Sequence, residues 1–98
     1  MRTRSKAIVI NEKDNVAMAI MPLQAGDTVV VSILGHIERV EILSHIPMGH
    51  KFALGTIEAG EDVIKYGEPI GRSTSQIARG DHVHVHNVVS HRARKEEA

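Results

Sequence analysis

A seven-residue pattern occurs three times in this chain, at residues 23–29, 57–63 and 77–83. Each copy reads as an apolar residue, two further residues, glycine, an acidic residue, any residue and valine. Glycine at this place supplies the positive φ of a tight turn, which other residues adopt only with strain. The pattern therefore predicts three turns that each enter a strand. Its spacing is irregular, 34 residues from Gly26 to Gly60 and 20 from Gly60 to Gly80, which indicates a compact barrel and not a solenoid.

The predicted strands are rich in β-branched residues and are bounded by Gly, Pro, Asn or Asp. They are residues 7–10, 16–20, 28–34, 37–43, 51–54 and 82–89. Gly35-His36 predicts a hairpin turn between two of them. Helix is predicted only as one or two short turns, at 12–18 and 73–78, and residues 67–72 are predicted to be rich in turns. The predicted fold class is all-β.

The size of the chain limits what it does alone. It has 98 residues, of which 42% are hydrophobic and only 2% aromatic, so the core is aliphatic. A domain of this length buries roughly 65% of its unfolded surface. That leaves little wall to enclose a ligand pocket of about 300–1,000 Å³, and a complete enzyme is not expected.

Charge and cysteine content exclude several function classes. The formal net charge is zero, but residues 1–6 carry +3 and residues 92–98 carry +1. We expect a basic tail at 1–6, a domain at 7–90 and a charged tail at 91–98. A basic face with stacking aromatics is missing, so nucleic-acid binding is not expected. The chain has no cysteine, which suits a cytoplasmic protein, and no apolar run approaches the roughly 20 residues of a membrane span.

Three histidines alternate with valine near the end of the predicted domain. In a strand, His82, His84 and His86 would share one face, and Val83 and Val85 the other. Neighbouring imidazoles on such a face lie about 6.5–7 Å apart along the strand, so two of them can converge on a metal ion or an anion. A third group would come from another strand or chain. The opposing interpretation, solvated histidines on an edge strand, stays open at this point, and His36, His45 and His91 are expected to be ordinary surface or turn residues.

Two further pairs of residues stand beside glycine. His50-Lys51 places an imidazole next to an ammonium group, and Lys65-Tyr66 places another lysine next to the only tyrosine. Cation-and-donor pairs of this kind suit a carboxylate ligand. The opposing interpretation is that both lysines are solvated and the tyrosine ring is packed. A phosphate-binding loop and a nucleophile elbow are both missing from the sequence.

Four linked motifs resemble one known family. They are residues 14–17 (Asp-Asn-Val-Ala), 46–54 (Ile-Pro-Met-Gly-His-Lys-Phe-Ala-Leu), 63–71 (Val-Ile-Lys-Tyr-Gly-Glu-Pro-Ile-Gly) and 80–87 (Gly-Asp-His-Val-His-Val-His-Asn). Together they resemble the small SAF domain of altronate and galactarate dehydratases, which is also similar to the separate small subunit of sulfolactate sulfo-lyase. The resemblance covers about residues 7–90.

The resemblance implies a compact β-clip fold and a lyase function. The implied reaction is β-elimination from an acidic hydroxy compound, with loss of water from a sugar acid or of sulfite from sulfolactate. It also implies a divalent metal ion, iron or manganese, and a large partner chain that carries most of the active site. The residues carried over are His82, His84 and His86 as metal ligands, His50, His84 and His86 as catalytic groups, and Lys51, Lys65, Tyr66 and Asn87 as substrate contacts.

One position departs from the family pattern. Members often have a histidine about three residues before the Asp-Asn-Val-Ala motif, where this chain has Asn11. An amide forms hydrogen bonds but does not shuttle a proton near neutral pH. This departure leaves the hydroxy acid open, and it keeps two alternatives in view: a sugar-acid-binding module without catalysis, and an assembly subunit. A chain that normally pairs with a larger one exposes apolar surface, so a homo-oligomer is predicted when it is purified alone.

Overall fold

The computed structural model describes residues 6–33 and 35–90. This part of the chain is built from short strands and contains no helix, so no helix in it is able to cross a membrane. The strands are β1 (Ala7–Ile8), β2 (Val16–Ala19), β3 (Thr28–Ile33), β4 (His36–Glu41), β5 (Lys51–Ala53), β6 (Asp62–Lys65), β7 (Glu68–Ser73), β8 (His82–Val83) and β9 (Val88–Ser90). The predicted all-β fold class is confirmed. The predicted tails fall almost entirely outside the described residues, as does His91.

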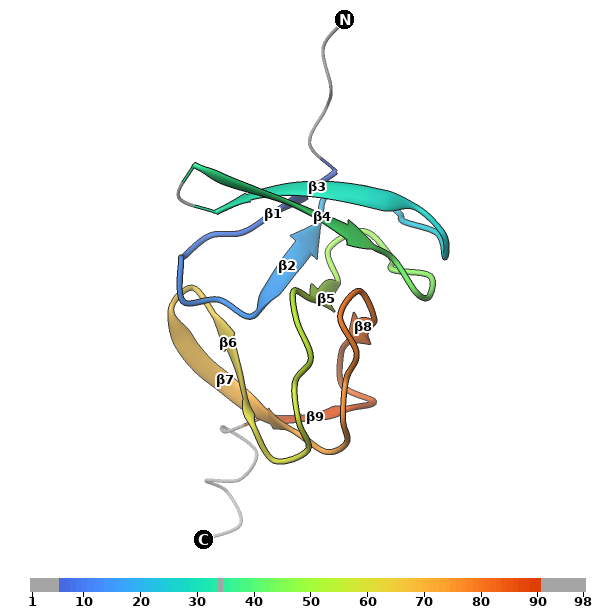
Figure 1. Ribbon diagram of the computed structural model, residues 1–98. Coiled ribbons are helices and arrows are strands. Elements are labelled where there is room, and N and C mark those ends of the chain that lie inside the picture. Colours follow the sequence, from blue (N-terminus) through green and yellow to red (C-terminus); the bar gives the residue numbers. More distant parts are fainter. Residues whose placement is uncertain (1–5, 34, 91–98) are drawn as a thin grey trace, which may run out of the picture.

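Three antiparallel sheets make up the architecture. The central sheet has the strand order β1-β2-β5-β8, the second consists of the β3–β4 hairpin, and the third has the order β6-β7-β9. Figure 1 shows the β3–β4 hairpin across one end of the molecule and the β6–β7 hairpin toward the other, with β2, β5 and β8 between them. The hairpin turn predicted at Gly35-His36 is off by one residue: Gly35 lies in the turn between β3 and β4, but His36 is the first residue of β4 and pairs with Ile33.

Four turns have the backbone geometry that the repeated pattern predicts. The three expected glycines, Gly26, Gly60 and Gly80, have φ values of 94°, 87° and 86°, and Gly49 makes a fourth turn at 86°. In the fourth, the Gly49 N–H donates to the Ala19 carbonyl (2.8 Å), and the Ala19 N–H donates to the His50 carbonyl (2.9 Å). The other three turns form the same reciprocal pair of bonds with Ile42, Ser73 and Ala53. The sequence pattern missed the fourth because His50 stands where the others have an acidic residue and Phe52 where they have valine.

The central sheet separates two apolar clusters. Phe52 is fully buried in the larger cluster, whereas the next residue, Ala53, is fully buried in the smaller one. Their partners on β2, Ala17 and Val16, divide in the same way. Successive side chains of a strand point to opposite faces, so β5 contributes side chains to both clusters. His50 directly precedes this strand, whose side chains are packed on both faces.

Three sequence predictions are wrong in detail. Residues 82–89 do not form one strand, because a turn at 84–87 separates β8 from β9. Residues 68–72 are strand and not turn, since the two-residue turn at Tyr66 and Gly67, with φ values of 57° and 76°, closes a β6–β7 hairpin just before them. The two helical turns do not form: residues 12–13 belong to a hydrogen-bonded turn, and Ser73 ends β7.

Candidate metal and substrate site

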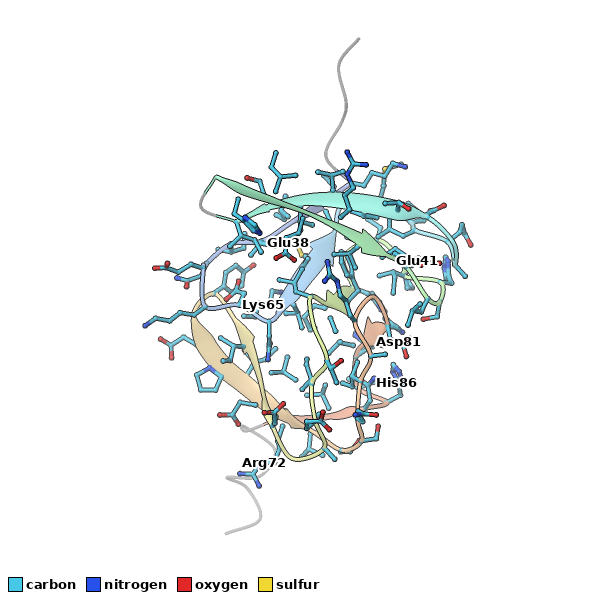
Figure 2. The ribbon with its side chains drawn as sticks, in the orientation of Figure 1. Glu38, Glu41, Lys65, Arg72, Asp81 and His86 are labelled. Carbon is cyan, nitrogen blue, oxygen red and sulfur yellow. The ribbon has the colours of Figure 1, made fainter. Side chains whose placement is uncertain are left out.

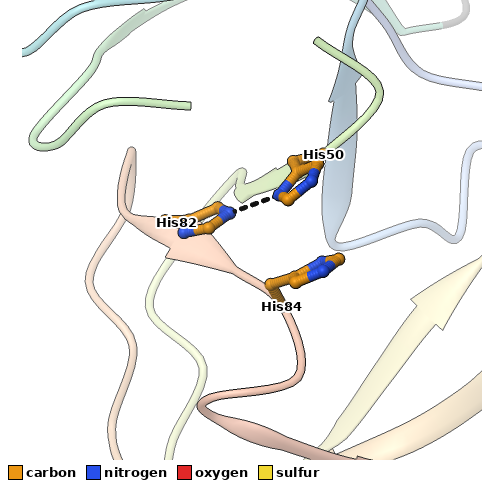
Figure 3. A group of neighbouring side chains, drawn as sticks. All are labelled: His50, His82 and His84. Atoms are coloured by element: carbon orange, nitrogen blue, oxygen red, sulfur yellow. Dashed lines mark hydrogen bonds between the residues drawn. The ribbon is translucent and has the colours of Figure 1, made fainter. Parts of the chain in front are cut away.

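Neighbouring strands of the central sheet bring His50 and His82 together. β5 pairs with β8, with Phe52 opposite His82 and Lys51 opposite Val83, so His50 at the entrance to β5 lies diagonally across from His82, the first residue of β8. Nδ1 of His50 lies 2.9 Å from Nε2 of His82, close enough for a hydrogen bond in which one ring donates (Figure 3). Asp81 supports this arrangement, because its carboxylate accepts hydrogen bonds from the His82 N–H (2.8 Å) and the Ser44 hydroxyl (2.7 Å).

The turn after β8 places His84 beside His50. Its ring stacks on that of His50, with centroids 3.9 Å apart and an interplanar angle of 18°. The amide of buried Asn87 holds the turn, since its oxygen accepts from the His84 N–H (2.9 Å) and its nitrogen donates to the His82 carbonyl (2.8 Å). Asn87 thus positions His84, and its predicted contact with substrate stays a prediction.

The histidine cluster, defined as His50, His82 and His84, has the donor set of a metal site. One nitrogen from each ring lies within 4.8 Å of the other two. Nitrogens that bind one ion at about 2.1 Å and at a right angle are about 3.0 Å apart, close to the separation between His50 and His82. Nδ1 of His84 is buried and has no hydrogen-bond partner among residues 6–33 and 35–90, which is costly unless it finds a ligand. Three imidazoles with nitrogens this close have the ligand type that divalent transition metals bind.

His86 lies beside the histidine cluster and does not belong to it. Its ring is 5.0 Å from that of His82 and tilted by 33°, and the residue is exposed. The sequence predicted one strand face carrying His82, His84 and His86. The structure instead groups the first two with His50, because the turn at 84–87 ends the alternation.

A cleft of about 270 Å³ opens next to the histidine cluster and shares His84 with it. Its lining residues are Lys51, Ile70, His84, Val85, Val88 and Ser90. The other predicted lysine, Lys65, lies at the end of β6 with its Nζ 4.9 Å from the centroid of the Tyr66 ring. Figure 2 places Lys65 and His86 on opposite sides of the view. Of the predicted substrate contacts, Lys51 therefore lines the cleft, whereas Lys65, Tyr66 and Asn87 do not.

Burial and mutual repulsion oppose positive charge on three of the site groups. Burial, then the charges of His86, His50 and His84, lower the pKa of His82 to about 4, with Asp81 opposing this. Burial lowers the pKa of His84 as well, assisted by His50, Lys51 and His86. Burial, followed by repulsion from Lys65, lowers the pKa of Lys51. Neutral imidazoles are the form that binds metal ions.

In the metal-free protein, the free energy of unfolding is expected to fall as the pH drops from 6.5 toward about 4. Over that range the unfolded chain protonates a histidine of usual pKa 6.5, whereas folded His82, with a pKa of about 4, stays neutral. Above pH 6.5 this histidine is neutral in both the folded and the unfolded chain, so it causes no loss of stability there. Urea unfolding at a series of pH values measures the effect. A His82→Asn variant is expected to show a shallower fall between pH 6.5 and 5, and a slope unchanged from that of the parent would contradict the assignment.

Comparison with known proteins agrees with this site. The family model described as the altronate/galactarate dehydratase SAF domain matches residues 5–91. This chain belongs to that SAF domain family. The match includes every residue of the histidine cluster and of the cleft, and the family resemblance predicted from the four motifs is confirmed.

The relatives that match this SAF domain are named as dehydratases and as sulfo-lyase subunits. It is 45% identical over 80 residues to altronate dehydratase of Escherichia coli, and 36% identical over 80 residues to altronate dehydratase of Bacillus subtilis; each match covers 82% of the SAF domain chain and 15% of the relative. It is 48% identical over 52 residues to (2R)-sulfolactate sulfo-lyase subunit alpha of Chromohalobacter salexigens, covering 53% of this chain and 55% of that subunit. The chain therefore spans a small part of the dehydratases and about half of the sulfo-lyase subunit.

Proposed function

We propose that this SAF domain is the small component of a lyase that catalyses β-elimination from an acidic hydroxy compound. The histidine cluster would contribute a divalent metal site, iron or manganese, to an active site completed by a larger chain. The observation that carries this proposal is the convergence of three imidazole nitrogens within 4.8 Å, next to a cleft that contains a lysine.

β-Elimination would require a different role from each of the neighbouring groups. Elimination removes a proton next to a carboxylate, so negative charge builds on that carboxylate; a bound divalent ion supplies stabilisation for it. Lys51 would hold the acidic group of the substrate through a charge-assisted hydrogen bond. His86 is the imidazole outside the histidine cluster, and its exposed ring beside His82 suits proton transfer.

The size of the chain and the names of its relatives support a larger partner. A cleft of about 270 Å³ is below the usual range of roughly 300–1,000 Å³ for ligand pockets. The matched segment is 15% of the altronate dehydratases, and one relative is named as an alpha subunit. We expect the partner to cover the histidine cluster, and the absence of cysteine suits action in the cytoplasm.

Metal binding by the full chain is the first test. Titration of the metal-free protein with Mn²⁺ or Fe²⁺ under anaerobic conditions, followed by calorimetry, is expected to give one site per chain. The variants His82→Ala and His84→Ala should each lose at least about 100-fold in affinity, since removal of a ligand exceeds the usual loss of about 10–100-fold for outer-shell partners. His45→Ala, an exposed histidine outside the cluster, is the matched control. Equal affinity in all four proteins would contradict the metal site.

Turnover of the complex tests the lyase itself. The tagged chain is purified from its native cell with any larger chain that accompanies it, and release of water from sugar acids or of sulfite from sulfolactate is assayed. Loss of turnover in the His84→Ala complex, with assembly intact, supports the proposal. Turnover that is unchanged by both His84→Ala and His86→Ala favours the alternative, a binding or assembly module without catalysis.

A further inference from the structure

The outer edge of β3, at one end of the molecule (Figure 1), is open. In the described part of the chain β3 pairs only with β4, and the Ile42 N–H donates to the Asp27 carbonyl just before β3 (2.8 Å). Hydrogen-bonding residues alternate along an antiparallel strand, so the odd-numbered residues of β3 face β4, whereas Thr28, Val30 and Ser32 direct their N–H and C=O groups outward. Among residues 6–33 and 35–90, none of these outward groups has a hydrogen-bond partner.

The opposite edge of the hairpin, along β4, is covered. Nη2 of Arg79 donates to the Arg39 carbonyl (2.8 Å), and the Leu43 N–H donates to the Gly80 carbonyl (3.0 Å). The turn at residues 79–80 therefore lies against β4. A further strand can add along the whole length of the hairpin only beside β3.

β3 also lacks the features that keep edge strands from pairing with other chains. Natural edge strands are usually short, irregular, or interrupted by lysine or proline. The other edge strands follow this rule, since β1 and β8 have two residues each, β9 has three, and β6 has an irregular register between Val63 and Ile64. β3 instead runs for six residues, Thr28–Ile33, without a charge, a proline or a glycine.

The side chains of β3 match those of a second, antiparallel β3. With a twofold axis at Val30, this valine lies opposite its own copy, and Thr28 lies opposite Ser32 of the second copy. Apolar pairs and hydroxyl pairs are both favourable across antiparallel strands. Each of these pairs sets outward N–H and C=O groups against each other and so exchanges two hydrogen bonds. No like charges meet along the strand.

We propose that β3 is a dimerisation edge, through which two copies of this chain form one continuous sheet in the order β4-β3-β3-β4. The twofold pairing uses both β3 edges, and residues 79–80 cover β4, so the assembly closes at two copies and does not grow into a fibre. β3 contributes no residue to the histidine cluster or to the cleft. Dimerisation is therefore independent of the proposed lyase function.

Sedimentation velocity on the full chain tests the dimer. Concentrations from about 1 µM to about 1 mM are needed, because a single strand pair is a small interface and dissociates readily. The parent is expected to pass from monomer to dimer and no further. Val30→Lys changes an exposed residue on the axis and sets two ammonium groups against each other, so dimerisation should weaken at least about tenfold. Ile37→Lys, the matched control, adds the same charge to the same face of β4 away from the axis and should dimerise as the parent does.

Charge reversal tests whether Val30 meets its own copy. Val30→Glu alone should be as weak a dimer as Val30→Lys, whereas an equal mixture of the two variants should dimerise, because opposite charges then lie across the axis. Urea unfolding monitored by circular dichroism checks that each variant is folded. A mixture that associates no better than either variant would overturn the proposal, as would an Ile37→Lys protein that is weakened as much as Val30→Lys.

Amide hydrogen exchange examines the same edge in the parent, without any variant. The N–H groups of Thr28, Val30 and Ser32 should exchange more slowly at high than at low protein concentration, because pairing protects them. The Ile37 N–H, which points outward from β4, should exchange at the same rate at both. Exchange that is independent of concentration, in a parent that stays monomeric, would refute the dimer. If Val30→Lys then also lost a larger chain that copurifies with the parent, the edge would belong to that chain and not to a second copy.

Discussion

Replacing Gly80 by alanine is expected to lower the free energy of unfolding by about 3 kcal/mol, the sum of backbone strain and overpacking. Gly80 has a φ of 86°, and an added Cβ would collide with the backbone carbonyl oxygen of Glu41. The backbone cannot move away cheaply, because the Gly80 N–H donates to Ala53 (2.8 Å) and the Gly80 carbonyl accepts from Leu43 (3.0 Å). Urea unfolding monitored by circular dichroism measures the loss.

Gly26→Ala is the matched control for this experiment. Gly26 occupies the equivalent turn with a φ of 94°, but nothing lies within 4 Å of the position of its Cβ. The variant should lose only the cost of the left-handed backbone, about 1–2 kcal/mol. If both variants lose the same amount, close packing at Gly80 contributes nothing and the explanation is wrong. Metal affinity should fall in Gly80→Ala alone, because β8 and His82 begin two residues later.

The second large effect is expected at Asn87. Asn87→Ala removes the amide that holds His84 and His82 by their backbones, so the affinity for Mn²⁺ should fall by about 10–100-fold, as for other outer-shell partners. The same change leaves two backbone groups without partners and should cost about 1–3 kcal/mol of stability. Calorimetric titration and urea unfolding of the same samples measure the two effects.

Gln76→Ala provides the comparison for Asn87→Ala. The Gln76 amide is exposed and bonds only to the Glu58 carboxylate among the described residues. Its removal should change neither metal affinity nor stability beyond about 0.5 kcal/mol. An Asn87→Ala protein that loses stability and keeps full metal affinity would show that the turn is not what positions His84.

The turns were predictable from sequence because their geometry is local. Glycine, an acidic residue and an apolar anchor specify each turn within seven residues, and Gly26, Gly60 and Gly80 all adopt the expected φ. In two of the turns the acid accepts a hydrogen bond from a backbone N–H three residues earlier, Asp27 from Gln24 and Glu61 from Glu58. His50 cannot accept in that way as a carboxylate does, so the fourth turn left no acidic signal in the sequence.

The composition of the histidine cluster was only partly predictable. Alternation of His and Val from residue 82 onward favoured one strand. Such a pattern does not show that a later side chain hydrogen-bonds to the backbone and turns the chain. Asn87 does this through its amide, and Val85, predicted to share a face with fully buried Val83, is 82% exposed. His50 lies 32 residues from His82, and only the pairing of β5 with β8 shows that their rings meet. Such long-range pairing is not encoded in local spacing.

The turn at residues 84–87 connects β8, at the edge of the central sheet, to β9, which belongs to the third sheet. His84 belongs to this turn, whereas His50 is fixed to the central sheet. A ligand bound by both rings would therefore link the central sheet to the turn that leads into the third sheet. Because only the four residues 84–87 separate β8 from β9, a chain that docked on β9 would contact the strand next to the turn that carries His84.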